Sequence, residues 1–202
     1  ASNKELAERV ESEYDSIDVL VNNAGILIPR LLVDPAGKEE IDPGSVEKMV
    51  SVNFKGSLYC TQAVVRRMID TGENGVIINM ASESGLEGSK GQSVYAATKA
   101  ALYSFSRSWA KELGDHGIRV VGVAPGILEE TELRDEDYEK SLAYSRGMTV
   151  EELRRDYEEV SVPLGRVGKL KEVADVVCFL ASDMASYITG TVVNVSGGKS
   201  RA

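Results

Sequence analysis

Val76-Ile77-Ile78-Asn79-Met80 leads to Ser82 and then, thirteen residues later, to Tyr95-Ala96-Ala97-Thr98-Lys99. The apolar run has the pattern of a buried strand. It therefore places Ser82 at the carboxyl edge of a parallel sheet, where open α/β sheets bind their ligands. Tyr95 and Lys99 are four residues apart in a predicted helix over 93–113, so their side chains share one face. An ammonium there favours the phenolate over a phenol whose pKa is otherwise about 10, which predicts a usable base.

Polar residues at two other places extend this pattern. Asn22-Asn23-Ala24-Gly25 follows a predicted strand over 17–22. Asn53, with Gly56 after it, lies in a predicted helix that begins at the N-cap Asp42 and runs to about residue 70. Taken singly, these features have ordinary explanations: a solvated Tyr–Lys pair, a turn that ends a strand, an exposed asparagine. Taken together with Ser82, they resemble the signature of the short-chain dehydrogenase/reductase family.

This resemblance implies a Rossmann-like, doubly wound α/β fold and a site for hydride transfer. In such a site Tyr95 would accept the alcohol proton, and Ser82 would hydrogen-bond the same oxygen. Lys99 would lower the pKa of Tyr95 and hold the nicotinamide ribose, while Asn53 would distort its helix and anchor a water relay to solvent. No metal site is implied. The residues implied to contact the dinucleotide are Asn22, Asn23, Ala24, Gly25, Tyr95, Lys99, Pro125, Gly126, Ile127 and Leu128.

The branch of the family that interconverts sorbitol 6-phosphate and fructose 6-phosphate with NAD shares further stretches. They are Glu83 directly after Ser82, and residues 124–129, 143–146, 165–170 and 197–201. Lysine and arginine are the usual partners of phosphate oxygens. The candidates to hold a substrate phosphate are Arg30, Lys90, Arg134, Arg146, Arg154 and Arg155, and the sequence does not choose among them. Another polyol dehydrogenase, a 3-oxoacyl reductase and a non-catalytic scaffold that keeps the fold remain alternatives.

Residues 127–165 predict a lid over the site. Two charged helices are expected there, over 135–146 and 150–159, separated by Gly147 and by a capping box from Thr149 to Glu152. An exposed helical hairpin held by salt bridges is the alternative. A lid that follows the cofactor turn would exclude water from hydride transfer.

Composition limits the other possibilities. The chain has 202 residues, enough for one domain (1–202), and a formal net charge of −9, which argues against nucleic acid or an anionic membrane as partner. Nothing resembles a signal peptide or a membrane span, so a soluble, cytoplasmic protein is expected. Cys60 and Cys178 are expected to be buried free thiols. His116, the only histidine, suits a helix end before Gly117 rather than catalysis.

The remaining elements complete an α/β pattern. An amphipathic helix over 3–14 should bury Leu6 and Val10, and strands are expected over 119–124 and 190–195, with a helix over 170–182 between them. The glycine-containing stretches 71–75 and 197–200 resemble phosphate-binding loops, but neither is expected to be followed directly by a helix, as such a loop requires. The family's first three strands have no counterpart, so we expect the C-terminal part of the full domain, with 17–22 as an open apolar edge. The predicted apolar stripe of helix 93–113 is Val94, Ala97, Ala101, Phe105, Trp109 and Leu113, where Trp109 would lie in the core or in a homodimer or homotetramer interface.

Overall fold

The computed structural model describes residues 2–72, 74–131, 133–159 and 161–200. Within them lies one parallel sheet of four strands in the order β1-β2-β3-β4. This is the contiguous α/β arrangement expected from the sequence, and β1 is an edge strand with Val19 and Val21 exposed. The strands are β1 (Val19–Asn22), β2 (Gly75–Met80), β3 (Ile118–Pro125) and β4 (Val192–Val195).

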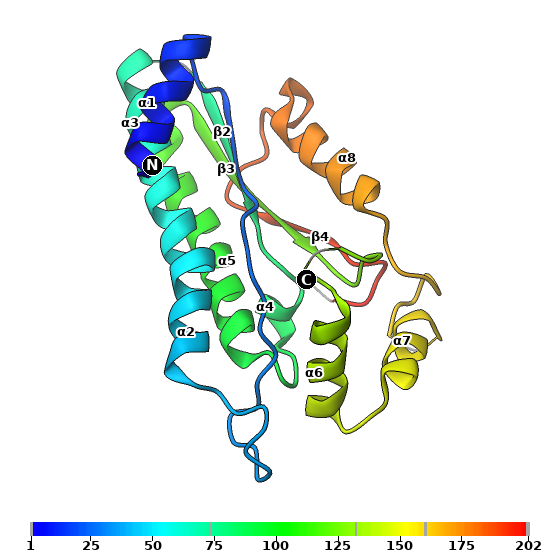
Figure 1. The fold of residues 1–202 in the computed structure, drawn as a ribbon. Coiled ribbons are helices and arrows are strands. Elements are labelled where there is room, and N and C mark those ends of the chain that lie inside the picture. The colour runs from blue at the N-terminus through cyan, green and yellow to red at the C-terminus, as the bar shows by residue number, and fades with distance from the viewer. Residues whose placement is uncertain (1, 73, 132, 160, 201–202) are drawn as a thin grey trace.

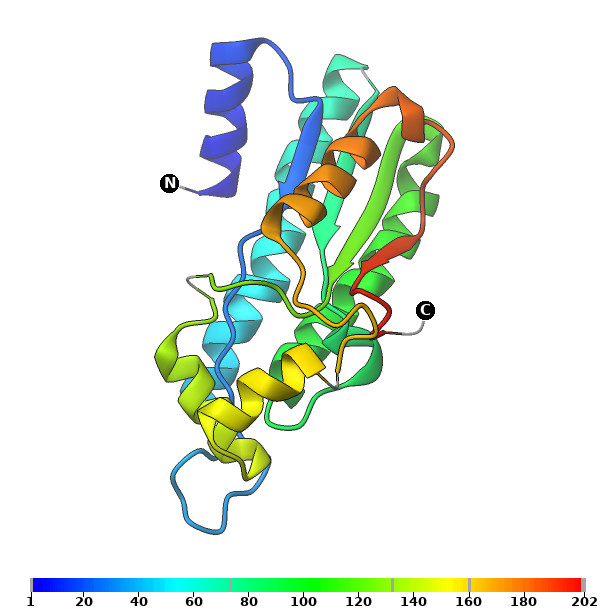
Figure 2. The same ribbon diagram turned by 90° about the vertical axis from the view of Figure 1, so that its right-hand side faces the viewer.

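Helices cover both faces of this sheet (Figures 1 and 2). One face carries α3 (Ser57–Thr71) and α5 (Ser93–Leu113), and the other carries α8 (Leu170–Ala181). The other helices are α1 (Asn3–Tyr14), α2 (Pro43–Met49), a π-helix (Val50–Gly56), α4 (Ser84–Glu87), α6 (Glu136–Arg146), α7 (Val150–Glu159) and short 3₁₀ turns at Gly114–His116 and Asp183–Ala185.

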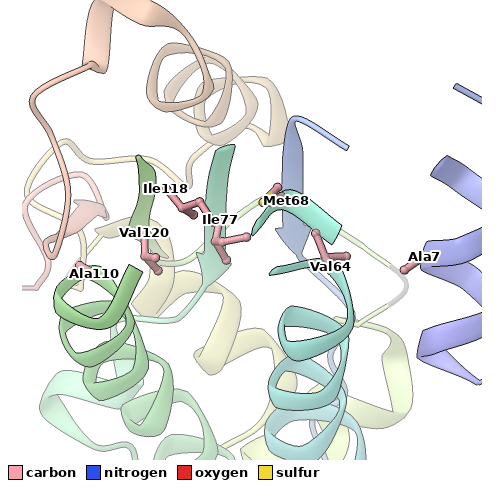
Figure 3. Close-up of a cluster of buried hydrophobic side chains, with 7 residues drawn as sticks. All are labelled: Ala7, Val64, Met68, Ile77, Ala110, Ile118 and Val120. Carbon is pink, nitrogen blue, oxygen red and sulfur yellow. The ribbon is translucent and has the colours of Figure 1, made fainter. Parts of the chain in front are cut away.

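Alternation along the central strands builds two cores. Ile77 and Val120 face α3 and α5, where they meet Val64 and Met68 (Figure 3). Their neighbours Ile78 and Val121 point to the opposite face, beneath α8. A strand buried on both faces is apolar at most positions, which is why the run 76–80 does not alternate. The exception is Asn79, which is fully buried and whose side chain is hydrogen-bonded to Asn22 and Ser106.

Local signals fixed several helix ends as the sequence predicts. The Asp42 side chain accepts a hydrogen bond from the backbone of Ser45 at 3.0 Å, with Pro43 in the first turn. Thr149 and Glu152 form the capping box that starts α7. Gly72, Gly117 and Gly147 end helices in the left-handed conformation, so the glycine-rich stretch at residue 72 is a helix end and not a phosphate loop.

Three expectations about burial are wrong. Leu6 is 52% exposed, because α1 turns the small Ala7 inward and so approaches α3 closely. Ala97 is exposed, and the buried face of α5 instead carries Tyr95, Thr98, Lys99 and Leu102. Cys178 is exposed and Cys60 only half-buried, although both are free thiols as expected.

The described residues show no helix long and apolar enough to cross a membrane. The same residues contain no group of three histidine, cysteine, aspartate or glutamate side chains placed to hold a metal ion.

Candidate active site

Ser82 stands where the central strands end. After β2, Ala81 donates its N–H to the carbonyl of Val123 at 2.8 Å, and Glu83 donates to Pro125 at 3.1 Å. These bonds carry the chain along the carboxyl edge of β3. Tyr103 of α5 donates its hydroxyl to the Ser82 carbonyl at 3.1 Å, so the backbone that presents Ser82 is fixed from two sides.

Tyr95 and Lys99 lie on the buried face of α5, with 7% and 5% of their surfaces exposed. The Lys99 ammonium is 5.7 Å from the centre of the Tyr95 ring, as expected for residues one helical turn apart. Both side chains and Ser82 line the same cleft, which has a volume of about 1440 Å³. The three residues that the sequence singled out are therefore brought together on one surface.

The pKa of Tyr95 moves in the direction opposite to the sequence-based expectation. Burial raises it to about 12, while a hydrogen bond with Ser82 acts to lower it. Burial also lowers the pKa of Lys99 to about 8. An ammonium is costly to bury, as is a phenolate, so burial is the largest cause of both pKa shifts.

Asn53 is fully buried within the π-helix, which rules out the exposed alternative. Its side chain accepts a hydrogen bond from the Ile26 N–H at 2.8 Å, and donates to the Ile26 carbonyl and the Thr98 hydroxyl at 2.9 and 3.0 Å. A π-helix shifts the backbone register by one residue, which is a known device at functional sites. The distortion expected around Asn53 is therefore present, and it ties the loop after β1 to α5.

Most of the residues assigned to the dinucleotide line the cleft. These are Asn23, Ala24, Gly25, Pro125, Gly126, Ile127 and Leu128, with Tyr95 and Lys99. Asn22 does not: its amide donates to Thr61 and Asn79 at 2.8 and 2.9 Å, inside the core. Asn22 thus joins β1 to β2 and α3, and its assignment to the dinucleotide is not supported by its position outside the cleft lining.

The lining fits a nicotinamide dinucleotide. A Cβ atom on Gly25 would lie 3.4 Å from the Lys99 nitrogen and 3.6 Å from the Asn53 oxygen, so the backbone of Gly25 in the cleft wall lies directly beside these two side chains. The cleft exceeds the roughly 300–1,000 Å³ of most small-molecule sites, as a dinucleotide and a substrate together require. Gly126, Ile127 and Leu128 supply a further wall at the end of β3.

The predicted lid is neither a plain exposed hairpin nor detached from the site. α6 and α7 pack on each other through Leu142, Ala143, Leu153 and Tyr157, beyond the carboxyl ends of the strands (Figure 2). Glu139, with 1% of its side chain exposed, pairs with Arg134 at 2.9 Å and with Arg154 at 2.6 Å. Although burial raises its pKa, the two guanidinium groups lower the pKa of Glu139 overall.

Sequence reasoning missed two polar contacts in the cleft. Lys199 lies in the stretch dismissed as an imitation phosphate loop, yet its ammonium is 2.6 Å from the Glu83 carboxylate. Gln92 donates its amide to the Tyr138 hydroxyl at 3.0 Å, joining the loop before α5 to α6. The one signal in the sequence is the position of Glu83 directly after the proposed catalytic Ser82. A carboxylate at such a position indicates that a cation from elsewhere in the chain lies beside it.

Comparisons with known proteins agree with this geometry. Residues 1–200 match the family model described as enoyl-(acyl carrier protein) reductase. The sorbitol-6-phosphate 2-dehydrogenase of Klebsiella pneumoniae is 58% identical over 96% of this chain and 73% of its own length. The 3-oxoacyl-[acyl-carrier-protein] reductase of Thermotoga maritima is 43% identical over 96% of this chain and 71% of its own length.

A solved structure gives the same result for the fold. The crystal structure of sorbitol-6-phosphate 2-dehydrogenase from Erwinia amylovora superposes with a TM-score of 0.86 and 30% identity, covering 99% of this chain and 75% of that one. The family-model match, the identity to these relatives and the superposition lead to one conclusion. This chain belongs to the short-chain dehydrogenase/reductase family of NAD(P)-dependent oxidoreductases that act on CH–OH groups.

Proposed function

We propose that this protein transfers hydride between NAD and a sugar-alcohol phosphate, interconverting sorbitol 6-phosphate and fructose 6-phosphate. The observation that carries the proposal is the joint placement of Ser82, Tyr95 and Lys99 in one cleft at the carboxyl edge of the sheet. The 58% identity to the Klebsiella pneumoniae sorbitol-6-phosphate 2-dehydrogenase supports the choice of substrate.

Oxidation of the secondary alcohol removes a proton from its oxygen and a hydride from its carbon, leaving a ketone. Tyr95 takes the proton and Ser82 donates a hydrogen bond to the same oxygen, which orients the reacting carbon. The bound dinucleotide supplies the acceptor for the hydride. Proton transfer by a positioned side chain contributes about 10²–10⁴-fold to a rate, and this is the contribution expected of Tyr95.

The raised pKa of Tyr95 sets the direction in which this residue works most easily. With a pKa of about 12, Tyr95 is protonated near neutral pH and is ready to give its proton to the oxygen of a ketone. In the oxidative direction it must first lose that proton. Lys99 supplies the nearby positive charge for this step, and the residues from Asn23 to Gly25 and from Pro125 to Leu128 hold the dinucleotide.

The lid prepares the cleft for this chemistry. Tyr138, Met148 and Tyr157 of the hairpin line the cleft opposite the sheet edge. Excluding water from a hydride transfer prevents side reactions and strengthens each electrostatic contact inside the site. The buried Glu139 with its two arginines holds the hairpin in this position.

A half-buried aromatic surface on α5 supports a homodimer or homotetramer. Phe105 stacks on Trp109 with ring centres 4.3 Å apart, and Phe54 packs beside Phe105 at 5.0 Å. Light scattering of the purified protein measures the oligomeric state directly.

The proposed location is the cytoplasm, because free thiols at Cys60 and Cys178 suit a reducing compartment.

A 3-oxoacyl reductase is the second candidate, since the Thermotoga maritima relative carries that name at 43% identity. The two functions differ in substrate, so one assay separates them. NADH or NADPH absorbance is followed with sorbitol 6-phosphate, unphosphorylated sorbitol and an acetoacetyl thioester. Turnover of sorbitol 6-phosphate with NAD is the expected result. Preference for the thioester would overturn the proposal, and failure of all three substrates would favour a non-catalytic scaffold.

A further inference from the structure

Six cations were equal candidates to hold a substrate phosphate, and their partners in the structure separate them. A guanidinium already paired with a carboxylate at close range is neutralised and has few donors left for an anion. A cation outside the cleft cannot reach a substrate held by Tyr95. Two criteria therefore separate the six cations: whether each is paired with a carboxylate, and whether each lines the cleft.

Four of the six fail one of these criteria. Arg30 pairs with Glu39, and Arg154 pairs with the buried Glu139, and neither lines the cleft. Arg134 lines the cleft, but it gives two donors to Glu139 and a third to the Leu128 carbonyl at 2.6 Å. Arg155 is exposed on α7 and lies outside the cleft lining.

Arg146 and Lys90 meet both criteria. Each lines the cleft, and neither forms an ion pair with a carboxylate among the described residues. The Arg146 guanidinium donates to the Ser89 hydroxyl at 3.2 Å and lies 6.0 Å from the centre of the Tyr157 ring. The Lys90 ammonium lies 3.4 Å from the Arg146 carbonyl oxygen.

Close packing holds these groups together. Gly91 has a φ of +80°, and a Cβ atom there would lie 2.6 Å from the Cβ of Ser145, so the loop before α5 rests directly on α6. Only glycine fits this contact without strain. As a result, the Lys90 ammonium contacts the backbone of Arg146 in the last turn of α6, and the Arg146 guanidinium contacts Ser89 in the loop before α5.

We propose that Arg146, Lys90 and the Ser89 hydroxyl form the subsite that binds the phosphate of a sugar-alcohol phosphate. The inference rests on the proposed function, because it assigns the phosphate of that same substrate. Arginine offers two parallel N–H donors to phosphate oxygens, lysine adds a compact charge, and the serine hydroxyl supplies a neutral donor. The phosphate of this substrate lies on C6, four carbons from the reacting C2, so its partners belong elsewhere in the cleft than directly beside Tyr95.

The surrounding charges permit an anion here. Glu83, Glu87 and Glu129 also line the cleft. Lys199 at 2.6 Å offsets the charge of Glu83, and Glu129 accepts a hydrogen bond from the Leu170 N–H at 2.7 Å. The Asp156 carboxylate in the cleft wall accepts a hydrogen bond from the Ser161 hydroxyl at 2.7 Å. In a chain with a formal net charge of −9, attraction for a dianionic substrate must come from local cations, and this pair provides it.

Steady-state kinetics of the complete protein with NAD test the assignment. Arg146→Gln and Lys90→Gln should each raise KM for sorbitol 6-phosphate by about 10- to 100-fold, as expected for loss of a charged hydrogen bond, with KM for NAD within about two-fold. Arg155→Gln, an exposed arginine outside the cleft, is the matched control and should leave both values unchanged. A KM for sorbitol 6-phosphate that stays at the wild-type value in both variants overturns the proposal. A rise confined to KM for NAD overturns it too, because the cations would then serve the dinucleotide.

Binding of inorganic phosphate separates this subsite from the proposed function. Phosphate should raise the melting temperature of the wild type and of Arg155→Gln, and should not raise that of the double variant Arg146→Gln/Lys90→Gln. If phosphate stabilises the proteins in this pattern but the wild type does not turn over sorbitol 6-phosphate, the anion site is supported and the proposed substrate is rejected. Equal stabilisation of all three proteins would reject the subsite even if sorbitol 6-phosphate is turned over.

Discussion

Lys99 donates a hydrogen bond from its ammonium to the carbonyl oxygen of Met80 at 2.6 Å, joining the middle of α5 to the last residue of β2. This bond fixes the distance between the helix that carries Tyr95 and the strand end that leads to Ser82. It also gives the buried ammonium a partner that it needs, because an unpaired buried charge is costly. The geometry of the site therefore depends on a bond between the sheet and the helix as well as on the spacing within the helix.

Replacement of Tyr95 by phenylalanine tests the proton transfer. We expect kcat to fall by about 10²–10⁴-fold, the usual contribution of a general acid or base, with NAD binding retained because the ring remains. The measurement is NADH absorbance with sorbitol 6-phosphate. Tyr59→Phe, at an exposed position outside the cleft, is the control. Activity of Tyr95→Phe within a few-fold of the wild type would assign the proton to another group.

The pKa of Tyr95 predicts how the rate depends on pH. Burial raises this pKa to about 12, so the phenol stays protonated to a higher pH than a free tyrosine. Ketone reduction, which needs the phenol, should therefore remain fast at neutral pH, whereas alcohol oxidation should rise from pH 7 to pH 10 as the phenolate fraction grows. Initial rates in both directions provide the measurement. An oxidation rate that falls across this range would contradict the assignment.

Lys99 predicts a pH dependence of stability. Its pKa is about 8 in the folded protein against 10.5 in the unfolded chain, so between these values the unfolded chain binds more protons. The free energy of unfolding should then rise with pH across this window, by on the order of 1–2 kcal/mol. Urea titrations at pH 8 and pH 10 measure the change in the wild type. Lys99→Met should lose this increment, and an identical pH dependence in both proteins would be evidence against a depressed pKa.

Asn53 predicts a stability effect larger than its size suggests. Asn53→Ala removes three hydrogen bonds and leaves the Ile26 N–H and carbonyl without their partners. We expect the free energy of unfolding to fall by about 2–4 kcal/mol, because buried polar groups that lose a partner are costly. Denaturant midpoints give the value. Lys55→Ala, on the same π-helix but paired on the surface with Glu47, should destabilise the protein much less than Asn53→Ala.

Glu139 offers a test of the lid. Glu139→Gln leaves two arginines facing a neutral amide, and loss of one partner of a buried pair costs about 3–5 kcal/mol. Residues 133–157 should then become sensitive to limited proteolysis, and kcat/KM should fall. Glu136→Gln, whose pair with Lys140 lies on the surface, is the matched control and should behave as the wild type. Equal protease resistance of both variants would show that the ion pairs do not hold the hairpin.

The sequence by itself determined the features whose causes lie within a few residues. The cap at Asp42, the left-handed Gly117 and Gly147, and the capping box at Thr149 each depend on hydrogen bonds within one turn, so their residue types suffice to predict them. The largely apolar run of β2, which does not alternate, likewise identified a strand buried on both faces. The four-residue spacing of Tyr95 and Lys99 placed both on one helix face.

Only the tertiary structure decided how distant segments meet. Lys199 reaches Glu83 across 116 residues, and Arg146 reaches Ser89 across 57, and no local pattern encodes such pairs. Packing decided which face of α5 is buried, and burial in turn reversed the direction of the Tyr95 pKa, because desolvation depends on everything that surrounds a group. Hydrogen bonds inside one turn are set by neighbouring residues, whereas the cost of burying a charge is set by the whole fold.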